Sequence, residues 1–414
     1  MAKRDKASEI AIDNLKGFSL TGAEFQSTMN VPTGYFALDF VIHYGYDPSR
    51  VDLTTLEGYK PGESLGLPLG KLVEIFGEEG SGKSSLAYRA VGYAQKMGLT
   101  CAWLDAEHSF SEDLARINGC NSDDIIYPNE VYYAEDFMDL ILGLCETDKI
   151  KMVRKNKPVE VNGPKIIVLD SIASLIPKAK AEALSEQQFM GLVPRLLSSN
   201  LGKIAACAEK NGVLVILINQ LREKIGVLYG NPEKSPGGRA LKHFCSLRLK
   251  LTKKNSKDAK IFREDEESGK EVLIGGYSSV RLEKNRFAKP FLESLFIPIY
   301  YEPYFPDIEE TAFDAGRQVK LITVRKGTYS WNDIKMEGRK KFIDHIMENE
   351  LLDDLIKSIK TKAEEESILL PPELVQYEIG KKDEVRRKIS GDRQTKDSTG
   401  SKSEPKKKRG KKSP

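Results

Sequence analysis

A glycine-rich stretch between an apolar run and a helical pattern carries the clearest chemistry in this sequence. Residues 77–84 read Gly-Glu-Glu-Gly-Ser-Gly-Lys-Ser and directly follow the apolar run 72–76. This is the Walker A pattern, whose glycines let backbone N–H groups surround a polyphosphate at the positive end of the following helix. A chance glycine-rich turn is the alternative, and the strand before the stretch and the helix after it disfavour that alternative.

The Walker A pattern predicts which ligand atoms its residues contact. Lys83 is expected to reach the β- and γ-phosphates of ATP, and Ser84 is expected to hold Mg²⁺. Asp170 ends the apolar run 165–169 and is the Walker B candidate that would hold the same ion. The other candidates for nucleotide binding are Gly77, Glu78, Glu79, Gly80, Ser81, Gly82 and Ser85.

Two further polar side chains follow apolar runs. Glu107 comes after the run 100–105, and a carboxylate there could orient or deprotonate the attacking water. A helix cap or a surface carboxylate is the alternative for Glu107. Gln220 comes after the run 213–218 and could sense the γ-phosphate, unless it is a plain amide at a strand end.

The same apolar runs predict the fold that positions these side chains. Near-continuous apolar runs that alternate with helical patterns indicate a parallel sheet covered on both faces. The sequence therefore predicts an α/β fold with a P-loop NTPase core and a mostly parallel central sheet. In such a sheet ligands bind at the carboxyl ends of the strands, where the polar residues stand.

Three later segments alternate between polar and apolar residues. They lie at 244–251, 277–283 and 294–299, and they predict half-exposed antiparallel strands that extend the sheet. A charged hairpin loop at 253–270 is expected between the first two.

The chain divides into four parts. We expect an N-terminal arm or short helix at 1–30, the ATPase core at 31–300, a small α+β lobe at 301–375 and a disordered basic tail at 376–414. One amphipathic helix is expected in the lobe, over residues 342–359.

Charge is distributed unevenly along the chain. The formal charge of +3 combines a tail at 381–414, with fourteen Lys or Arg and five Asp or Glu, with a remainder of net charge −6. A solvated tail of charge +9 is expected to contact a polyanion such as a nucleic acid. A nuclear localisation signal at 405–412 is the alternative for the same segment.

Composition narrows the class of protein. No apolar run approaches the ~18 residues that a membrane span needs, and the N-terminus does not read as a signal peptide, so we expect a cytoplasmic protein. The five cysteines are scattered, which predicts reduced core residues and no zinc site.

Two long segments mix basic, apolar and glycine residues. They lie at about 182–195 and 221–239, and long irregular segments in compact domains are usually functional or disordered. Cations beside apolar wedges suit single-stranded nucleic acid, because phosphates are neutralised while bases are separated. A mobile lid over the nucleotide is the alternative for the second loop.

These residues together resemble the RecA recombinase family of bacteria and phages. The resemblance covers about residues 31–291, and its strongest segments are 70–84, 104–108, 169–179 and 218–233. The last two segments are not shared by P-loop ATPases in general. The family identity that they indicate implies a RecA-like core.

The resemblance also implies roles for individual residues. The catalytic set would be Glu107, Lys83, Gln220, Lys284 and Arg286, where Glu107 is the catalytic carboxylate and Gln220 the allosteric glutamine. Lys284 and Arg286 would act on the γ-phosphate of a neighbouring subunit, as an arginine finger does. The DNA-binding set would be Met190, Arg195, Arg222, Lys224, Ile225, Gly237, Gly238 and Arg239, where Met190 and Ile225 are wedges between bases.

Some positions depart from the family pattern. Ser111 and Leu114 stand where the family often has an acid and an aromatic residue beside adenine, and His243 replaces an aromatic residue. Insertions near 44–66 and 152–164 have no family role.

The function implied by the resemblance is an ATP- and DNA-dependent recombinase. It would form a helical filament on single-stranded DNA and exchange strands with a homologous duplex, using ATP and Mg²⁺. Single-strand-binding or mediator proteins are further candidate partners. Two other classes stay open, namely a motor or regulatory ATPase of the same fold, such as a hexameric helicase, and a DNA-binding scaffold without activity.

Overall fold

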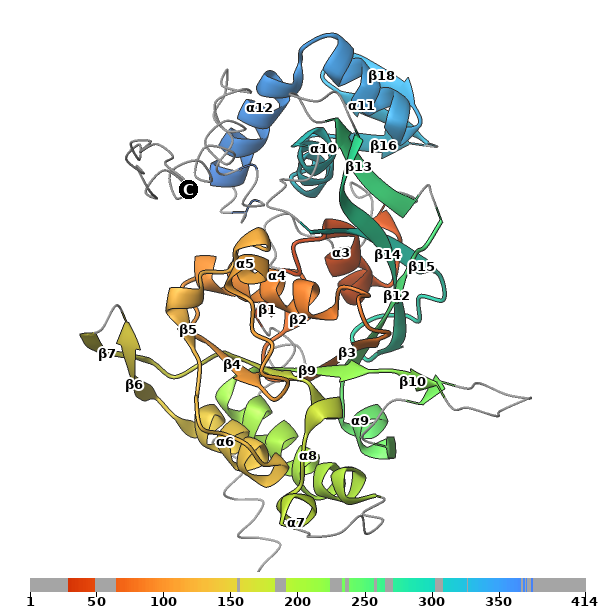
Figure 1. Cartoon of the computed structure of the whole chain (residues 1–414). Coiled ribbons are helices and arrows are strands. Elements are labelled where there is room, and N and C mark those ends of the chain that lie inside the picture. The colour runs from red at the N-terminus through yellow and green to blue at the C-terminus, as the bar shows by residue number, and fades with distance from the viewer. Residues whose placement is uncertain are drawn as a thin grey trace, which may run out of the picture.

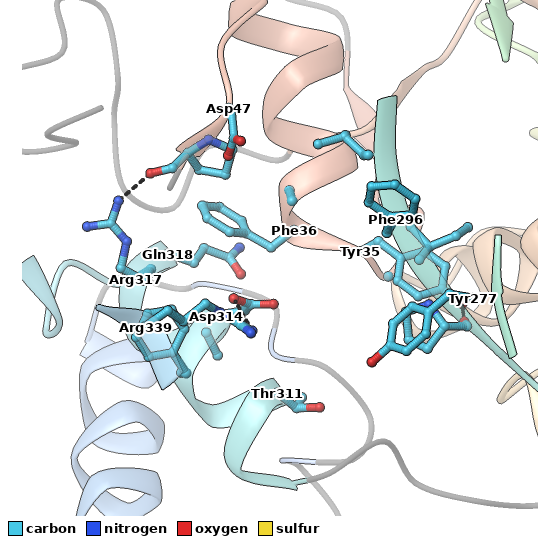
Figure 2. A pocket seen from close by; sticks show the side chains of 18 of the residues that line it. Tyr35, Phe36, Asp47, Tyr277, Phe296, Thr311, Asp314, Arg317, Gln318 and Arg339 are labelled. Atoms are coloured by element: carbon cyan, nitrogen blue, oxygen red, sulfur yellow. Dashed lines mark hydrogen bonds and ion pairs between the residues drawn. The ribbon is translucent and has the colours of Figure 1, made fainter. Parts of the chain in front are cut away.

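A large α/β body carries a smaller α+β lobe in this protein (Figure 1). The computed structural model describes residues 29–48, 65–154, 157–182, 191–223, 233–234, 238–256, 259–264, 271–301, 308–325, 327–365, 368, 370 and 374. The predicted N-terminal arm, except residues 29 and 30, and the predicted basic tail lie outside these residues.

A nine-stranded sheet forms the centre of the body. Its strand order is β13-β14-β12-β3-β9-β8-β4-β5, and β15 pairs with β14. Neighbouring strands from β12 to β5 are parallel, which confirms the predicted parallel core. These strands are β3 (Leu72–Gly77), β4 (Cys101–Asp105), β5 (Ile125–Ile126), β8 (Ile166–Asp170), β9 (Leu214–Gln220) and β12 (Leu247–Lys253).

The antiparallel extension differs in two ways from the sequence prediction. Strand β12 pairs antiparallel with β14, as predicted, but on its other side it pairs in parallel with β3, and its first three residues are all buried although the alternation predicted a half-exposed strand. The alternation misled because Arg248, its first polar residue, lies buried beside Glu74. The expected hairpin loop at 253–270 also contains a strand, β13 (Lys260–Glu264), which pairs with β14 (Glu271–Asn285); β15 (Ser294–Tyr300) completes the sheet.

Helices cover both faces of the parallel sheet, which explains why its strands are apolar throughout. On one face the helix α4 (Lys83–Lys96) packs on a core that includes Ile75, Trp103 and Val168. On the other face α6 (Ala134–Glu146) and α8 (Leu192–Asn211) pack on a second core around Leu104 and Leu169. Shorter helices are α3 (Phe36–Tyr44), α5 (Glu112–Ile117), α7 (Lys178–Ala181) and α9 (Gly238–Phe244).

Three pairs of short strands lie outside the central sheet. They are β1 (Asn30–Val31) with β2 (Leu67–Pro68), β6 (Lys149–Arg154) with β7 (Lys157–Asn162), and β10 (Arg222–Glu223) with β11 (Glu233–Lys234). The insertion near 152–164 is therefore the greater part of a hairpin, which extends from the body beside α6 (Figure 1). Within the long loop at 221–239, the strand β10 pairs with β11. The expectation that this loop contains no regular structure is therefore wrong.

The small lobe has its own apolar core. It contains α10 (Ile308–Gln318), β16 (Thr323–Arg325), β17 (Thr328–Trp331), β18 (Ile334–Glu337), α11 (Arg339–Glu348) and α12 (Leu352–Glu365). The prediction of a single amphipathic helix over 342–359 is wrong. The apolar residues of that segment belong to two helices, α11 and α12. The chain turns between them at Glu350, whose φ of 56° lies in the left-handed region and ends helical geometry.

All five cysteines are free and buried, as the sequence predicted. Burial raises the pKa of the Cys120 and Cys145 thiols to about 12, so both stay protonated at neutral pH. In the described part of the chain, no helix is both long enough and apolar enough to span a membrane.

Candidate nucleotide-binding site

The loop between β3 and α4 is closed by bonds to one backbone carbonyl. Lys83 Nζ and Ser81 Oγ both donate to Glu78 O, each at 2.7 Å. Gly82 precedes the helix with a φ of +85°, which a residue with a side chain rarely adopts. The loop is thus already folded around the N-terminus of α4, where helix N–H groups lack partners within the helix.

The Lys83 ammonium lies buried at the base of this loop. Its burial lowers the pKa of Lys83, and the nearby Asp170 carboxylate counteracts that shift. In the structure the ammonium rests on a neutral carbonyl, so a phosphate would offer it a stronger, charge-assisted partner.

The predicted metal ligands lie side by side. Ser84 Oγ donates to Asp170 Oδ2 at 2.8 Å, so one serine and one carboxylate oxygen face the same point. Burial raises the pKa of Asp170 to about 7, the Ser84 hydrogen bond opposes that rise, and repulsion from Glu107 adds to it. A cation at this point would favour the ionised carboxylate.

This oxygen pair fits Mg²⁺. No described group of three or more His, Cys, Asp or Glu residues could hold a metal ion by itself. Mg²⁺ is usually bound by one or two carboxylates together with waters and substrate phosphates, so a dedicated cage of protein ligands is not required.

Glu107 is the focus of a small hydrogen-bond network. Its Oε1 atom accepts from Ser171 Oγ, from Ser174 Oγ at 3.2 Å and from Gln220 Nε2 at 3.2 Å. Three donors on one oxygen leave Oε2 as the atom that can accept from a water molecule. The carboxylate is therefore oriented by its bonds to Ser171, Ser174 and Gln220.

Strand pairing explains why these residues meet. Gln220 lies opposite Gly77 in the β3–β9 pair, and Asp105 lies opposite Asp170 in the β4–β8 pair. All four stand at the carboxyl ends of parallel strands. The sequence-based expectation of one polar edge is correct, because Lys83, Ser84, Glu107, Asp170 and Gln220 lie together there.

Sequence reasoning missed Ser171 and Ser174. Their only signal in the sequence is their place one and four residues after Asp170, where the short helix η3 (Ile172–Ser174) returns the second hydroxyl toward Glu107. Ser111, which stands at an expected adenine position, instead caps α5, because its Oγ accepts from Leu114 N at 3.1 Å.

The expected DNA-binding residues are only partly described. Arg195 lies exposed in the first turn of α8, and Gly238 and Arg239 begin α9. The backbone of Arg222 pairs with that of Lys234. Met190, Lys224, Ile225 and Gly237 lie outside the described residues.

Lys284 and Arg286 contact the end of α9 in their own chain. Lys284 Nζ donates to Lys242 O at 2.8 Å and to His243 O at 3.0 Å, and Arg286 Nη2 donates to His243 O at 3.3 Å. Cations at a helix C-terminus interact favourably with its exposed carbonyls. Lys284 is half-buried, and burial together with repulsion from Arg286 lowers its pKa.

The parallel sheet, the Walker A loop and the paired Ser84 and Asp170 define a P-loop NTPase. The family model described as the RecA N-terminal domain matches residues 62–303, and the chain belongs to the RecA family. Membership confirms the predicted class of RecA-type recombinase and of a DNA-dependent ATPase.

Known relatives match over most of their length. Protein RecA of Caldanaerobacter subterraneus subsp. tengcongensis is 32% identical over 87% of this chain and 94% of its own. Protein RecA of Symbiobacterium thermophilum is 31% identical over 92% of this chain and 98% of its own. The crystal structure of the RadB recombinase has a TM-score of 0.39 at 22% identity, over 58% of this chain and 90% of that one, a likeness too slight to bear on function.

Proposed function

We propose that this protein polymerises on single-stranded DNA and hydrolyses ATP with Mg²⁺ while it exchanges homologous strands. Lys83 and the loop N–H groups would bind the phosphates, and Ser84 and Asp170 would hold Mg²⁺, which would neutralise charge on the phosphate oxygens. Glu107 would orient the attacking water through its Oε2 atom and take its proton. A cytoplasmic location stays a prediction.

One contact carries this proposal, the hydrogen bond of 3.2 Å from Gln220 Nε2 to Glu107 Oε1. Gln220 is the last residue of β9, and the loop assigned to DNA begins at the next residue, with Arg222 only two positions away. Leu221 N also donates to Gly77 O at 3.0 Å, so the start of that loop is attached to the end of the phosphate-binding strand. A change at the phosphates can therefore reach the DNA loop through adjacent backbone.

The pair Lys284 and Arg286 supports assembly into a filament. Both cations lie near the surface and are held by carbonyls at the end of α9, which follows the DNA loop directly. In a polymer they would reach the γ-phosphate of the next subunit and complete its site. Hydrolysis would then require a neighbour as well as DNA.

ATPase rates with and without single-stranded DNA test the proposal. We expect the wild-type rate to rise with DNA, Arg222→Ala to lose the rise while it still binds nucleotide, and Glu107→Gln to lose hydrolysis in both conditions. Lys203→Ala, which removes a surface cation from α8, is the control and should behave as wild type. A rate that is indifferent to DNA and to protein concentration would contradict the proposal and favour another P-loop ATPase class.

A further inference from the structure

The loop that carries Glu107 is tied at both ends to one buried carboxylate. Asp105 Oδ1 accepts from Glu107 N at 3.1 Å, and Asp105 Oδ2 accepts from Phe110 N at 2.8 Å. Between these two points the chain turns at His108, whose φ is 53°. Asp105 is only 6% exposed, so water competes little for its oxygens.

A third donor reaches the same carboxylate from a different strand. Tyr127 directly follows β5, and its hydroxyl donates to Asp105 Oδ2 at 3.0 Å. Burial and this hydrogen bond raise the pKa of Tyr127 to about 12, so the hydroxyl keeps its proton at neutral pH. The Asp105 carboxylate is thus held from the edge of the sheet while it holds the loop.

Aromatic packing fixes the far end of the loop. The Phe110 ring lies edge-on to Tyr88, Trp103 and Tyr127, with centroid distances of 5.4, 5.8 and 5.2 Å. At the near end, Glu107 N also donates to Asp170 O at 3.2 Å. With both ends fixed, little freedom remains to the Glu107 backbone, so Asp105 sets the point from which the Glu107 side chain reaches Ser171, Ser174 and Gln220.

We propose that Asp105 is a positioning residue for Glu107, and that Tyr127 in turn orients Asp105. This inference rests on the role that the proposed function gives to Glu107. Asp105 is given no direct part in the reaction, because the donors to its two oxygens are Glu107 N, Phe110 N and the Tyr127 hydroxyl of its own chain. It acts on the reaction only through the loop.

Displacement of a catalytic group by about 1 Å can lower a rate by roughly a hundredfold, so small shifts of this loop are measurable. We expect Asp105→Asn to lower kcat of DNA-stimulated hydrolysis by at least about tenfold, because an amide nitrogen would face donors. Tyr127→Phe removes one bond and should lower kcat by about threefold. KM for ATP should change less than twofold in both variants, since Lys83 and the loop at 77–84 are untouched.

Tyr301→Phe is the matched control. Tyr301 is 44% exposed and Tyr127 is 43% exposed, and Tyr301 follows β15, away from Asp105. Equal kcat values for Tyr127→Phe and Tyr301→Phe would overturn the inference, even if Asp105→Asn fails to fold. A fall in kcat for Tyr127→Phe with unchanged melting temperature and unchanged binding of a fluorescent ADP analogue would support it.

A double-variant comparison separates a path through Glu107 from a general effect. If Asp105 acts through Glu107, then Tyr127→Phe should not reduce the residual rate of Glu107→Gln any further, whereas independent effects would multiply. If Glu107→Gln alone keeps full DNA-stimulated hydrolysis, the role proposed for Glu107 fails. If Glu107→Gln loses hydrolysis and Tyr127→Phe keeps the kcat of the wild-type protein, only the present inference fails.

Discussion

Glu74 and Arg248 form an ion pair inside the central sheet, between Glu74 Oε2 and Arg248 Nε. The two residues face each other across the parallel strands β3 and β12, and their side chains are 0% and 7% exposed. Asn219 Nδ2 donates to Glu74 Oε1 at 2.9 Å, and the Arg248 guanidinium lies 4.5 Å from the Phe76 ring centroid. The Glu74 carboxylate thus connects the neighbouring strands β12, β3 and β9, three residues before β3 ends at the phosphate-binding loop.

Removal of Glu74 should therefore destabilise the protein strongly. Glu74→Ala leaves the Arg248 charge buried without its carboxylate, and breaking such pairs costs about 3–5 kcal/mol. Urea denaturation followed by circular dichroism measures this loss. The matched control is Glu209→Ala, which breaks the exposed pair of Glu209 with Lys71 at 2.8 Å and should cost less than about 1 kcal/mol. Equal losses for the two variants would contradict the expectation.

Gln220 should transmit DNA binding to the site. Gln220→Ala removes the donor to Glu107 Oε1 but leaves Lys83, Ser84 and Asp170 intact. We expect nucleotide binding and the slow DNA-independent rate to stay within about twofold, while DNA stimulation falls by about tenfold, a coupling loss of about 1.4 kcal/mol. Steady-state ATPase assays across a range of DNA concentrations measure it. Gln95→Ala, which removes an exposed amide bonded to Asn121, should keep full stimulation.

The sequence predicted the parallel core because its strands are buried on both faces and therefore apolar throughout. It did not predict that β12 also pairs in parallel with β3, because the buried Arg248 resembles the polar position of a half-exposed strand. It did not predict two helices after residue 338, because an apolar pattern continues across the turn at Glu350. The alternation of polar and apolar residues within a segment does not show which residues from distant segments pair, as Glu74 and Arg248 do.

The candidate site shows the same limit. Motif spacing identified Lys83, Ser84 and Asp170, because phosphate binding requires those groups in that order. The partners of Glu107 escaped motif reasoning, since Ser171 and Ser174 are common residues whose importance comes from the parallel pairing of β4 with β8. Side chains that orient a catalytic group are therefore found in the structure and not in the sequence.

Asp170 should make the free energy of unfolding depend on pH. Burial raises its pKa from 3.8 to about 7, so the folded protein keeps a proton that the unfolded chain releases near pH 4. The raised pKa of Asp170 therefore stabilises the folded protein. This stabilisation is fully present below about pH 4 and is lost as the pH rises to about 7. Asp170→Asn should remove that part of the pH dependence of urea denaturation.

Binding of Mg²⁺ and ATP should reverse the preference of Asp170, because the ion favours the carboxylate. At pH 6, below the raised pKa of about 7, binding should release close to one proton. Calorimetry in two buffers of different ionisation enthalpy counts that proton. The same count for Asp170→Asn as for wild type would show that another group supplies it.

The positive charge of the basic tail should strengthen binding to DNA. Deletion of residues 381–414 removes a net charge of +9, so we expect weaker binding to duplex DNA and a smaller slope of affinity against salt concentration. Fluorescence anisotropy at several salt concentrations measures both. A tail of the same composition in scrambled order separates the mechanisms, because counterion release depends on charge and not on residue order. If the scrambled tail binds as weakly as the deletion, the segment recognises DNA through specific contacts, and the electrostatic account is wrong.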